Sequence, residues 1–509
     1  MTKVARILAR HFTGPVLLIE AFQRWRQTPK TGTALLAYAI GGKKSLPLLL
    51  VASLSLTALA QEAPRVKTGW NFGVLPSVAF DADYGFQGGL LGNIYYYGDG
   101  SQYPEYIHSL YAEGAYTTKG RGIFRLNYDS RYLIPRHGLT IDVTYLPDAM
   151  CDFYGFNGYQ SRFNSDWCAW SNDPAEVSDA YRSRAFYKMK RDLFRLAGDI
   201  NGTLHGPLRW NAGAGLLYYR IDKCDIERLN GDNIFNPALP RSQQKPLDPD
   251  MRGLYEQYCA WGLIDKAEAH GGWHPYLRGG ISLDTRDKRT GPSRGIYADA
   301  FVTYSAAFGE QRAYNHLQLN LTFRHYVPLV GHERLTLAYR IGTQNLLAGQ
   351  SPFYMKSYLN TQFIQRVIYE GLGGANSLRG ILASRICADG FLYANVELRS
   401  RIAAFDIGRQ RFYIGLNPFF DLGMVTQPYR QKEIEVLCSS ANGDLSDYFW
   451  EENTPIYRPH IAAGMGLKVG MNENFVFSVE WATPLGDRLY RQQDNDKVSN
   501  LYIKMGYLF

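Results

Sequence analysis

The chain has 509 residues, among them 37 Tyr and 50 Gly, and aromatic residues make up 14% of it. No apolar run reaches the roughly 20 residues that a membrane-spanning helix needs, so the composition excludes a helical membrane protein. The net charge of +8 does not indicate a nucleic-acid partner, because residues 1–60 hold eight basic residues and one acidic residue, and the remainder is nearly neutral.

The chain begins with a predicted presequence that ends at Ala60. Lys43 and Lys44 precede the apolar stretch 46–59, which closes on an A-x-A tripeptide. These are the parts of a secretory signal, so we expect cleavage after Ala60. Residues 1–42 reflect either a start codon placed too early or an unusually long basic region.

After a short segment, 61–69, apolar and polar residues alternate. Leu319, Leu321 and Phe323, for example, are separated by Asn320 and Thr322. Successive side chains of a strand point to opposite faces, so such rows predict one lipid-facing side and one lumen-facing side. The pattern predicts sixteen strands, near 69–80, 85–97, 106–117, 122–133, 138–146, 184–204, 207–221, 269–285, 295–306, 312–327, 333–346, 391–403, 411–425, 458–470, 474–484 and 499–509.

The lengths of the connections distinguish a membrane barrel from a soluble β-sandwich. Connections after predicted strands 5, 7, 11 and 13 have roughly 30 to 50 residues, and those after even-numbered strands have about ten or fewer. Outer-membrane barrels have short periplasmic turns and long outer loops. We therefore expect an all-β fold, a transmembrane antiparallel β-barrel over residues 70–509, in the outer membrane of a Gram-negative cell and in contact with its lipids and lipopolysaccharide.

All six cysteines fall in the predicted outer loops. An even number on the oxidising side of the membrane favours disulfides, and the spacings resemble no zinc site. We expect the pairs Cys151–Cys168, Cys224–Cys259 and Cys387–Cys438, with free thiols as the alternative.

The last predicted strand carries an apolar row that we expect to face lipid: Leu501, Ile503, Met505, Tyr507 and Phe509. Tyr507 and the aromatic Phe509 are similar to the C-terminal signal by which barrel-assembly machinery recognises its clients.

Four segments occur in a characteristic order: Asp284-Thr285-Arg286-Asp287 with Gly291-Pro292-Ser293-Arg294-Gly295 after it, Arg379-Gly380-Ile381, Ala394–Arg399, and Phe419–Gly423. They resemble motifs of the BamA/TamA-like outer-membrane assembly superfamily, also called the bacterial surface-antigen family. The resemblance extends from Phe72 to Phe509 and departs from the family at Ile381, where an aromatic residue is usual. It implies that the sixth loop, 347–390, folds into the barrel.

Charged residues of two neighbouring predicted strands share the lumen wall. Glu397 alternates with the apolar Val396 and Leu398, and Asp421 occupies an inward position on the next strand. A guanidinium can donate paired hydrogen bonds to such carboxylates. The family resemblance implies that Arg379 is fixed to Glu397 and Asp421; ordinary solvated lumen charges are the alternative.

Three functions are compatible with these features. The first is assistance with the insertion or translocation of proteins or lipids through a seam between the first and last strands, with the first strand short or poorly paired around Pro76. Only about nine residues separate Gln61 from this strand, which leaves no room for a periplasmic polypeptide-transport (POTRA) domain, so an assembly-machine or periplasmic partner is expected. The second is a passive pore. The third is a structural subunit that binds through loops 147–183, 222–268 and 426–457. The sequence contains no H-E-x-x-H motif, and its one G-x-S-x-G match, residues 291–295, lies in the predicted turn between two strands and not at a strand-to-helix elbow. We therefore expect no enzyme activity, metal or cofactor.

Overall fold

The computed structural model describes residues 66–509 except 82–84, 104, 119, 289–290, 362–370, 408–409, 441–444, 451–455, 472–474, 487–499 and 506. The predicted presequence lies outside the described residues, so its cleavage stays a prediction. Residues 66–509 belong to one unit, whose regular secondary structure is mostly antiparallel sheet.

Alternating sequence stretches form the strands of this sheet. They are β1 (Trp70–Asp81), β2 (Gly85–Tyr96), β3 (His108–Thr117), β4 (Gly122–Ile134), β5 (His137–Leu146), β6 (Cys151–Asp152), β7 (Lys188–His205), β8 (Leu208–Asp222), β9 (Gly271–Asp284), β10 (Gly295–Ser305), β11 (His316–Val330), β12 (Leu335–Gly349), β13 (Gly390–Ser400), β14 (Ala403–Ile407), β15 (Gln410–Gln427), β16 (His460–Met471), β17 (Phe475–Pro484) and β18 (Asn500–Met505).

Short helices occupy the connections. They are α4 (Ile226–Asn230), α5 (Leu254–Ala260), α6 (Lys266–Ala269), α7 (Gly331–Arg334) and α8 (Gln431–Ser440), with 3-10 turns at Gly158–Gln160, Ser165–Trp167, Pro174–Glu176, Arg241–Gln243, Gly309–Tyr314 and Phe353–Met355. Within the part of the chain that the structure describes, no helix has the length and apolar character needed to cross a membrane.

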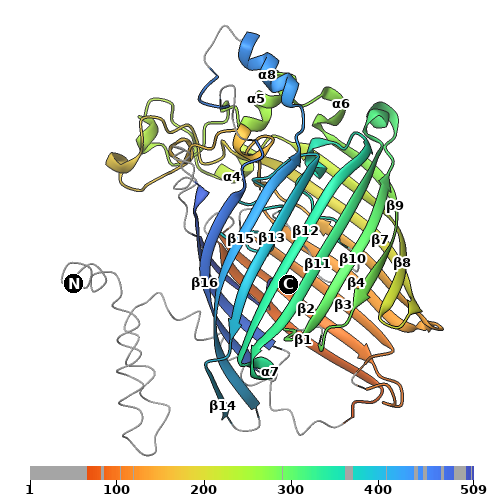
Figure 1. The fold of residues 1–509 in the computed structure, drawn as a ribbon. Helices are drawn as coiled ribbons and strands as arrows, with labels where there is room; N and C mark the ends of the chain where they lie inside the picture. The colour runs from red at the N-terminus through yellow and green to blue at the C-terminus, as the bar shows by residue number, and fades with distance from the viewer. Residues whose placement is uncertain are drawn as a thin grey trace, which may run out of the picture. The chain divides into compact units, whose positions relative to one another are not determined.

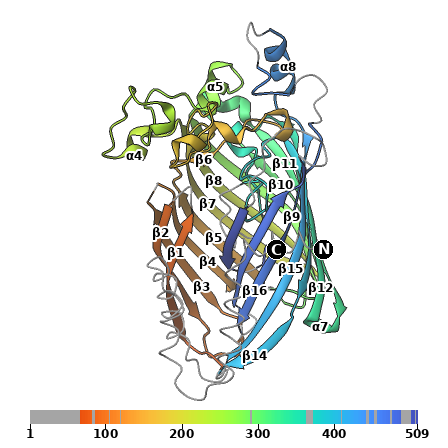
Figure 2. The same ribbon diagram turned by 90° about the vertical axis from the view of Figure 1, so that its left-hand side faces the viewer.

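The strands follow one another as an up-and-down meander that curls into a β-barrel (Figures 1 and 2). At two places, two consecutive strands pair with the same neighbouring strand. β5 and β6 both pair with β7, and β13 and β14 both pair with β15. The predicted number of sixteen strands depends on counting each of these pairs as one strand. The long connections gather at one end, hereafter the loop end, and the short ones, including α7, at the other, hereafter the turn end (Figure 2).

Each strand presents one apolar and one polar face. On β9, Trp273, Leu277 and Ile281 are exposed on the outer surface, whereas His274 and Arg278 are buried on the inside. This division is the one that the sequence alternation predicts, because a lipid-facing wall excludes charges and a lumen accepts them.

β1 differs from the sequence expectation. It pairs with β2 at every position from Trp70↔Tyr96 to Asp81↔Gly85. The prediction of a short first strand was therefore wrong, and β1 is well paired on its β2 side. Pro76 has no N–H to donate. A proline is tolerated in a strand where its nitrogen faces an edge without a hydrogen-bonded neighbour. Among the described residues no pairing joins β1 to β18.

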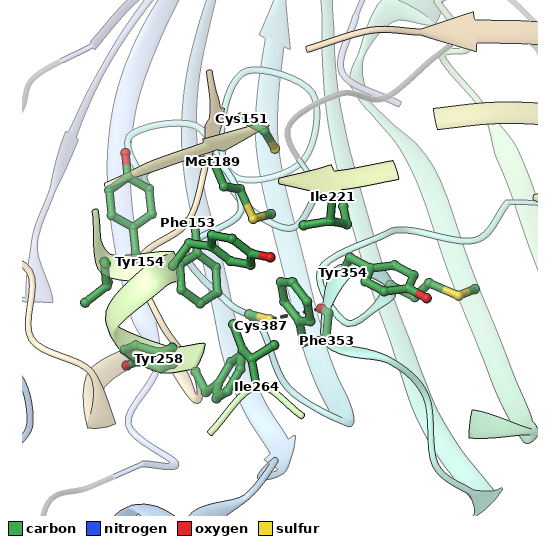
Figure 3. Close-up of a cluster of buried hydrophobic side chains, with 14 of the residues drawn as sticks. Cys151, Phe153, Tyr154, Met189, Ile221, Tyr258, Ile264, Phe353, Tyr354 and Cys387 are labelled. Carbon is green, nitrogen blue, oxygen red and sulfur yellow. Dashed lines mark hydrogen bonds between the residues drawn. The ribbon is translucent and has the colours of Figure 1, made fainter. Parts of the chain in front are cut away.

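The loop end is covered by a packed aromatic cluster, hereafter the dome cluster (Figure 3). Phe153 lies at its centre, with ring centroids 5.3 Å from Tyr258 and 5.9 Å from Phe353, both edge-on. Edge-to-face packing of this kind adds to the stabilisation from apolar burial. The cluster draws on the segments 147–187, 223–270, 350–389 and 428–459, and its aromatic members include Phe153, Tyr154, Phe156, Tyr187, Tyr255, Tyr258, Phe353, Tyr354, Tyr429 and Phe449.

Candidate functional site: a buried charge cluster in the lumen

The connection between β12 and β13 carries Arg379 into the barrel. Its turn depends on Gly373, whose φ of +126° is one that residues with a side chain rarely adopt. The Ser377 hydroxyl closes the turn, with Gly373 N donating to Ser377 Oγ at 2.8 Å. Arg340 Nη2 and Asn395 Nδ2 both donate to the Ser377 carbonyl, at 3.1 and 3.0 Å. The inward path that the sequence predicts for this loop is the one the structure shows.

Arg379 is fully buried and lies among three carboxylates. Its Nε and Nη2 donate to the two oxygens of Asp421 at 2.9 and 3.0 Å, a forked arrangement, and its main-chain N donates to the same group at 2.8 Å. Nη1 forms an ion pair with Glu397 Oε1 at 2.7 Å. The guanidinium also stacks on the Phe419 ring, 3.5 Å from its centroid. The structure thus brings together the three residues that the sequence singled out.

Three further charged groups complete this cluster: Arg399, which strand alternation places on the lumen wall beside Glu397, and Glu480 and Lys468, which the sequence did not single out. Glu480 of β17 accepts from Arg379 Nη1 at 3.3 Å and pairs with Lys468 of β16. Arg399 Nε donates to Glu397 Oε2 at 2.8 Å. Three cations (Arg379, Arg399 and Lys468) therefore face three anions (Glu397, Asp421 and Glu480). Such a balance matters because an unpaired buried charge is costly.

The electrostatics keep Arg379 charged. Burial by itself lowers the pKa of Arg379, but the attraction of Asp421 and Glu397 outweighs it, so the pKa lies above its ordinary value. The group acts as a permanent cation that links the loop to the wall of the barrel.

The tip of the loop also reaches the last strands of the sheet. Gly380 N donates to Tyr502 Oη of β18 at 2.9 Å. A Cβ on Gly380 would lie 2.9 Å from Ala462 Cβ and 3.1 Å from Ala482 Cβ, and the residue has a φ of +80°. Only glycine fits this contact without displacement. Arg379 and Gly380 together connect the loop to β13, β15, β17 and β18.

The second motif lies at the turn end and has a different role. Arg286 Nη2 pairs with Asp284 Oδ2 at 2.8 Å, and Asp287 accepts from Ser293 N at 3.1 Å and from Ser293 Oγ at 2.5 Å. Gly295 has a φ of +102°, and a Cβ there would collide with the Thr285 carbonyl. These residues fold the hairpin turn between β9 and β10 and do not contact Arg379.

Replacing Asp287 by alanine should destabilise this turn by about 1–3 kcal/mol, because Ser293 loses its acceptors. Burial raises the pKa of Asp287, but the hydrogen bonds from Ser293 outweigh it, so the pKa lies below its ordinary value. The carboxylate therefore contributes stability at neutral pH, and this contribution is lost as the pH falls through its folded-state pKa. Amide exchange of Ser293 at pH 7 and at pH 2, each relative to the intrinsic exchange rate at that pH, checks this, with Asp232→Ala in an exposed loop as the control. Equal exchange rates in both variants at pH 7 would refute it.

The end of the chain corrects one prediction. Leu501 and Ile503 are exposed on the outer surface as expected, but Tyr507, Leu508 and Phe509 lie inside the lumen. Arg399 Nη2 donates to the Phe509 main-chain oxygen at 2.8 Å, and the Arg399 guanidinium lies 4.3 Å from the Tyr507 ring centroid. The outward orientation predicted for Tyr507 and Phe509 was therefore wrong, because a lumen cation and the apolar contact with Tyr326 and Ala338 compete with lipid for these side chains. Their role as a targeting signal stays a prediction.

The disulfide prediction was also wrong. All six cysteines are free thiols: Cys151, Cys168, Cys224, Cys259, Cys387 and Cys438. The loops fold so that most of these side chains pack as small apolar groups; Cys151 and Cys387 are members of the dome cluster, and the Cys387 thiol lies 3.6 Å from the Phe353 carbonyl (Figure 3). Burial raises the pKa of the Cys387 thiol to about 12, which makes it unreactive.

The described residues hold no group of three or more His, Cys, Asp or Glu side chains placed to bind a metal ion. The Arg379 cluster holds the loop to the barrel wall by ion pairs. Each of its three carboxylates is buried and pairs with a cation of the cluster.

The model of the Omp85 superfamily domain matches residues 154–509, more than half of the chain. A search of the curated proteins found no match. Among solved structures, the chain is similar to BamA from Haemophilus ducreyi lacking POTRA domains 1–3, at 13% identity and a TM-score of 0.48, over 86% of this chain and 70% of that one.

The chain is also similar to CdiB from Escherichia coli, at 9% identity and a TM-score of 0.45, over 87% of this chain and 63% of that one. For CdiB from Acinetobacter baumannii the identity is 10% and the TM-score 0.39, over 86% of this chain and 59% of that one. The chain thus spans less than two thirds of either CdiB chain. From the match of the family model, the chain belongs to the Omp85 superfamily.

Proposed function

We propose that this chain is an outer-membrane barrel that assists the insertion or translocation of proteins at the outer membrane, together with a partner protein and without a chemical step of its own. The observation that carries the proposal is the buried Arg379 cluster. It fixes the β12–β13 loop inside the lumen and against the C-terminal strands, in a chain of the Omp85 superfamily. A loop fixed inside the lumen in this way obstructs conduction through the bore, and it therefore favours a function at the barrel wall over a conducting channel.

The seam supports the same function. β1 is fully paired with β2 on one side, and among the described residues it has no strand on the other. β18 is only six residues long. An unpaired strand edge is a template for another strand, and an incoming polypeptide could pair with it.

The dome cluster argues against the passive pore. Glu268 of α6 is buried and accepts hydrogen bonds from Phe353 N at 2.7 Å, from Tyr429 Oη at 2.8 Å and from Arg430 Nη2 at 3.3 Å. This single carboxylate joins three of the segments that cover the loop end. Burial, followed by the proximity of Glu268, raises the pKa of Tyr429 well above its ordinary value, so the phenol remains a hydrogen-bond donor.

Glu268→Ala should open the loop end, because it leaves two buried donors and a cation without their common acceptor, at a cost of about 1–3 kcal/mol for each. In planar lipid bilayers the wild type is expected to give poor, intermittent conductance and the variant long open events. Glu310→Ala in a 3-10 turn is the control and should behave as the wild type. Steady porin-like conductance of the wild type would favour the passive pore instead.

Depletion of the protein in its native cell tests the proposed function. Quantitative proteomics of the outer membrane should show loss of a set of barrel or surface proteins, with the wild-type gene restoring them. An unchanged outer-membrane proteome would contradict the proposal. Affinity purification from native membranes addresses the third reading, a structural subunit, by showing whether nascent barrels co-purify.

A further inference from the structure

The turn end carries a hairpin that projects beyond the rest of the barrel. It consists of β14 (Ala403–Ile407) and the first residues of β15, paired from Ala403↔Ile414 to Ile407↔Gln410. In both ribbon views it reaches further from the loop end than α7 does (Figures 1 and 2). We call it the turn-end hairpin.

A bulge separates this hairpin from the barrel wall. Val396 lies opposite Phe420 on β15, but Ala403 lies opposite Ile414, so the β13–β14 side holds one extra residue. β12 begins at Leu335, opposite Ser400, and does not extend alongside β14. Within the part of the chain that the structure describes, the outer edge of β14 therefore has no neighbouring strand.

The exposed face of the hairpin is apolar. All five residues of β14 are exposed, and the exposed fractions of Phe405 and Ile407 are 40% and 59%. Ile402 beside them is 60% exposed. Phe405 stacks on Phe412 across the strands, with ring centroids 5.8 Å apart, which holds the face flat. Edge strands are ordinarily protected by prolines, lysines or a covering loop; β14 has one charged residue, Asp406.

The surroundings of the hairpin are positively charged. Glu333 of α7 pairs with both Lys288 and Arg401, so one anion serves two cations. The exposed Arg334, whose main-chain oxygen accepts from Arg401 N, adds to this excess, whereas Arg411 lies opposite Asp406 and does not. An apolar strand edge bordered by cations favours an extended segment with alternating apolar side chains and acidic flanks.

We propose that the outer edge of β14 binds such a segment of a soluble periplasmic partner protein, which continues the barrel sheet by one strand. The inference rests on the proposed function, which orients the barrel in the outer membrane with its turn end towards the periplasm. A second copy in the same membrane is a poorer occupant, because two copies related by a two-fold axis along the membrane normal would present their β14 strands in parallel.

Hydrogen exchange measured by mass spectrometry tests this without knowledge of the partner. In native outer-membrane vesicles, the amides of residues 403–407 should exchange about tenfold more slowly than in purified protein in lipid nanodiscs. Amides of β12 should exchange equally in both. The double variant Phe405→Lys/Ile407→Lys should exchange rapidly in both, while its heat-modifiable migration remains that of the wild type.

Equal exchange of residues 403–407 in vesicles and nanodiscs would overturn the proposal, and so would slow exchange in nanodiscs, since lipid alone would then cover the edge. A photo-crosslinker at position 407 identifies the occupant; a product with the mass of two copies of this chain would also overturn it. None of these outcomes changes the result expected from depletion of the protein. A failure of this inference can therefore be distinguished from a failure of the proposed function.

Discussion

Replacing Arg379 by alanine should lower the free energy of unfolding by about 3–5 kcal/mol, the range expected when one partner of a buried ion pair is removed. Asp421 would lose its forked donor, Glu397 would be left with Arg399 as a partner, and Glu480 would keep Lys468. Phe419 would also lose the group that covers its ring. Urea titration in lipid vesicles, followed by heat-modifiable migration, measures the change.

Two control variants make this prediction specific. Arg379→Lys keeps the charge but cannot donate the forked pair to Asp421, so it should fall between the wild type and alanine. Arg131→Ala removes an exposed ion pair with Glu105 and should cost about 1 kcal/mol or less. If Arg379→Ala unfolded at the same urea concentration as Arg131→Ala, the buried cluster would not be what holds the loop.

Gly380→Val should also be strongly destabilising. A branched side chain at positive φ is unfavourable, and here it would also meet Ala462 and Ala482 on the barrel wall. The loop tip would have to move away from the wall. This movement would break the hydrogen bond from Gly380 N to Tyr502 and would displace Arg379 from its carboxylate partners. We expect a total cost of about 2–5 kcal/mol, the sum of backbone strain and overpacking.

Gly262→Val separates the two contributions. Gly262 has a φ of +73° but no atom within 4 Å of the position of a Cβ, so it carries the backbone strain alone. The difference between the two variants measures the contact of the loop tip with β16 and β17, and amide exchange of residues 375–382 should rise only in Gly380→Val. Equal destabilisation by both substitutions would show that the tip is not packed against the wall.

The sequence predicted those parts of the site that depend on strand alternation. Glu397 and Asp421 could be placed on one wall because each is flanked by outward apolar residues, and the lumen side of a barrel strand follows from this period of two. Glu480 and Lys468 obey the same rule, yet nothing marked them among the many lumen charges. Their proximity to Arg379 depends on how far the loop reaches across the lumen, which alternation does not determine.

The ends of elements were harder to predict than their interiors. The apolar period continues from Leu501 through Phe509, but the chain leaves the sheet after β18, because Arg399 and the Tyr326–Ala338 contact hold Phe509 inside the barrel. The cysteine pairs failed for a related reason. Loop tertiary structure, which no local pattern specifies, buries Cys151, Cys224 and Cys387 in separate places and leaves Cys438 exposed.

The β12–β13 loop is fixed inside the barrel, and cross-linking of a cysteine pair can test this position. Leu378 packs against the wall so closely that a Cβ on Gly423 of β15 would meet its side chain. In a background with the native cysteines replaced by serine, Leu378→Cys/Gly423→Cys should form a disulfide on mild oxidation in native membranes and alter migration of the unreduced protein. Two thiols that stay free under these conditions, in a barrel that is otherwise folded, would contradict the account.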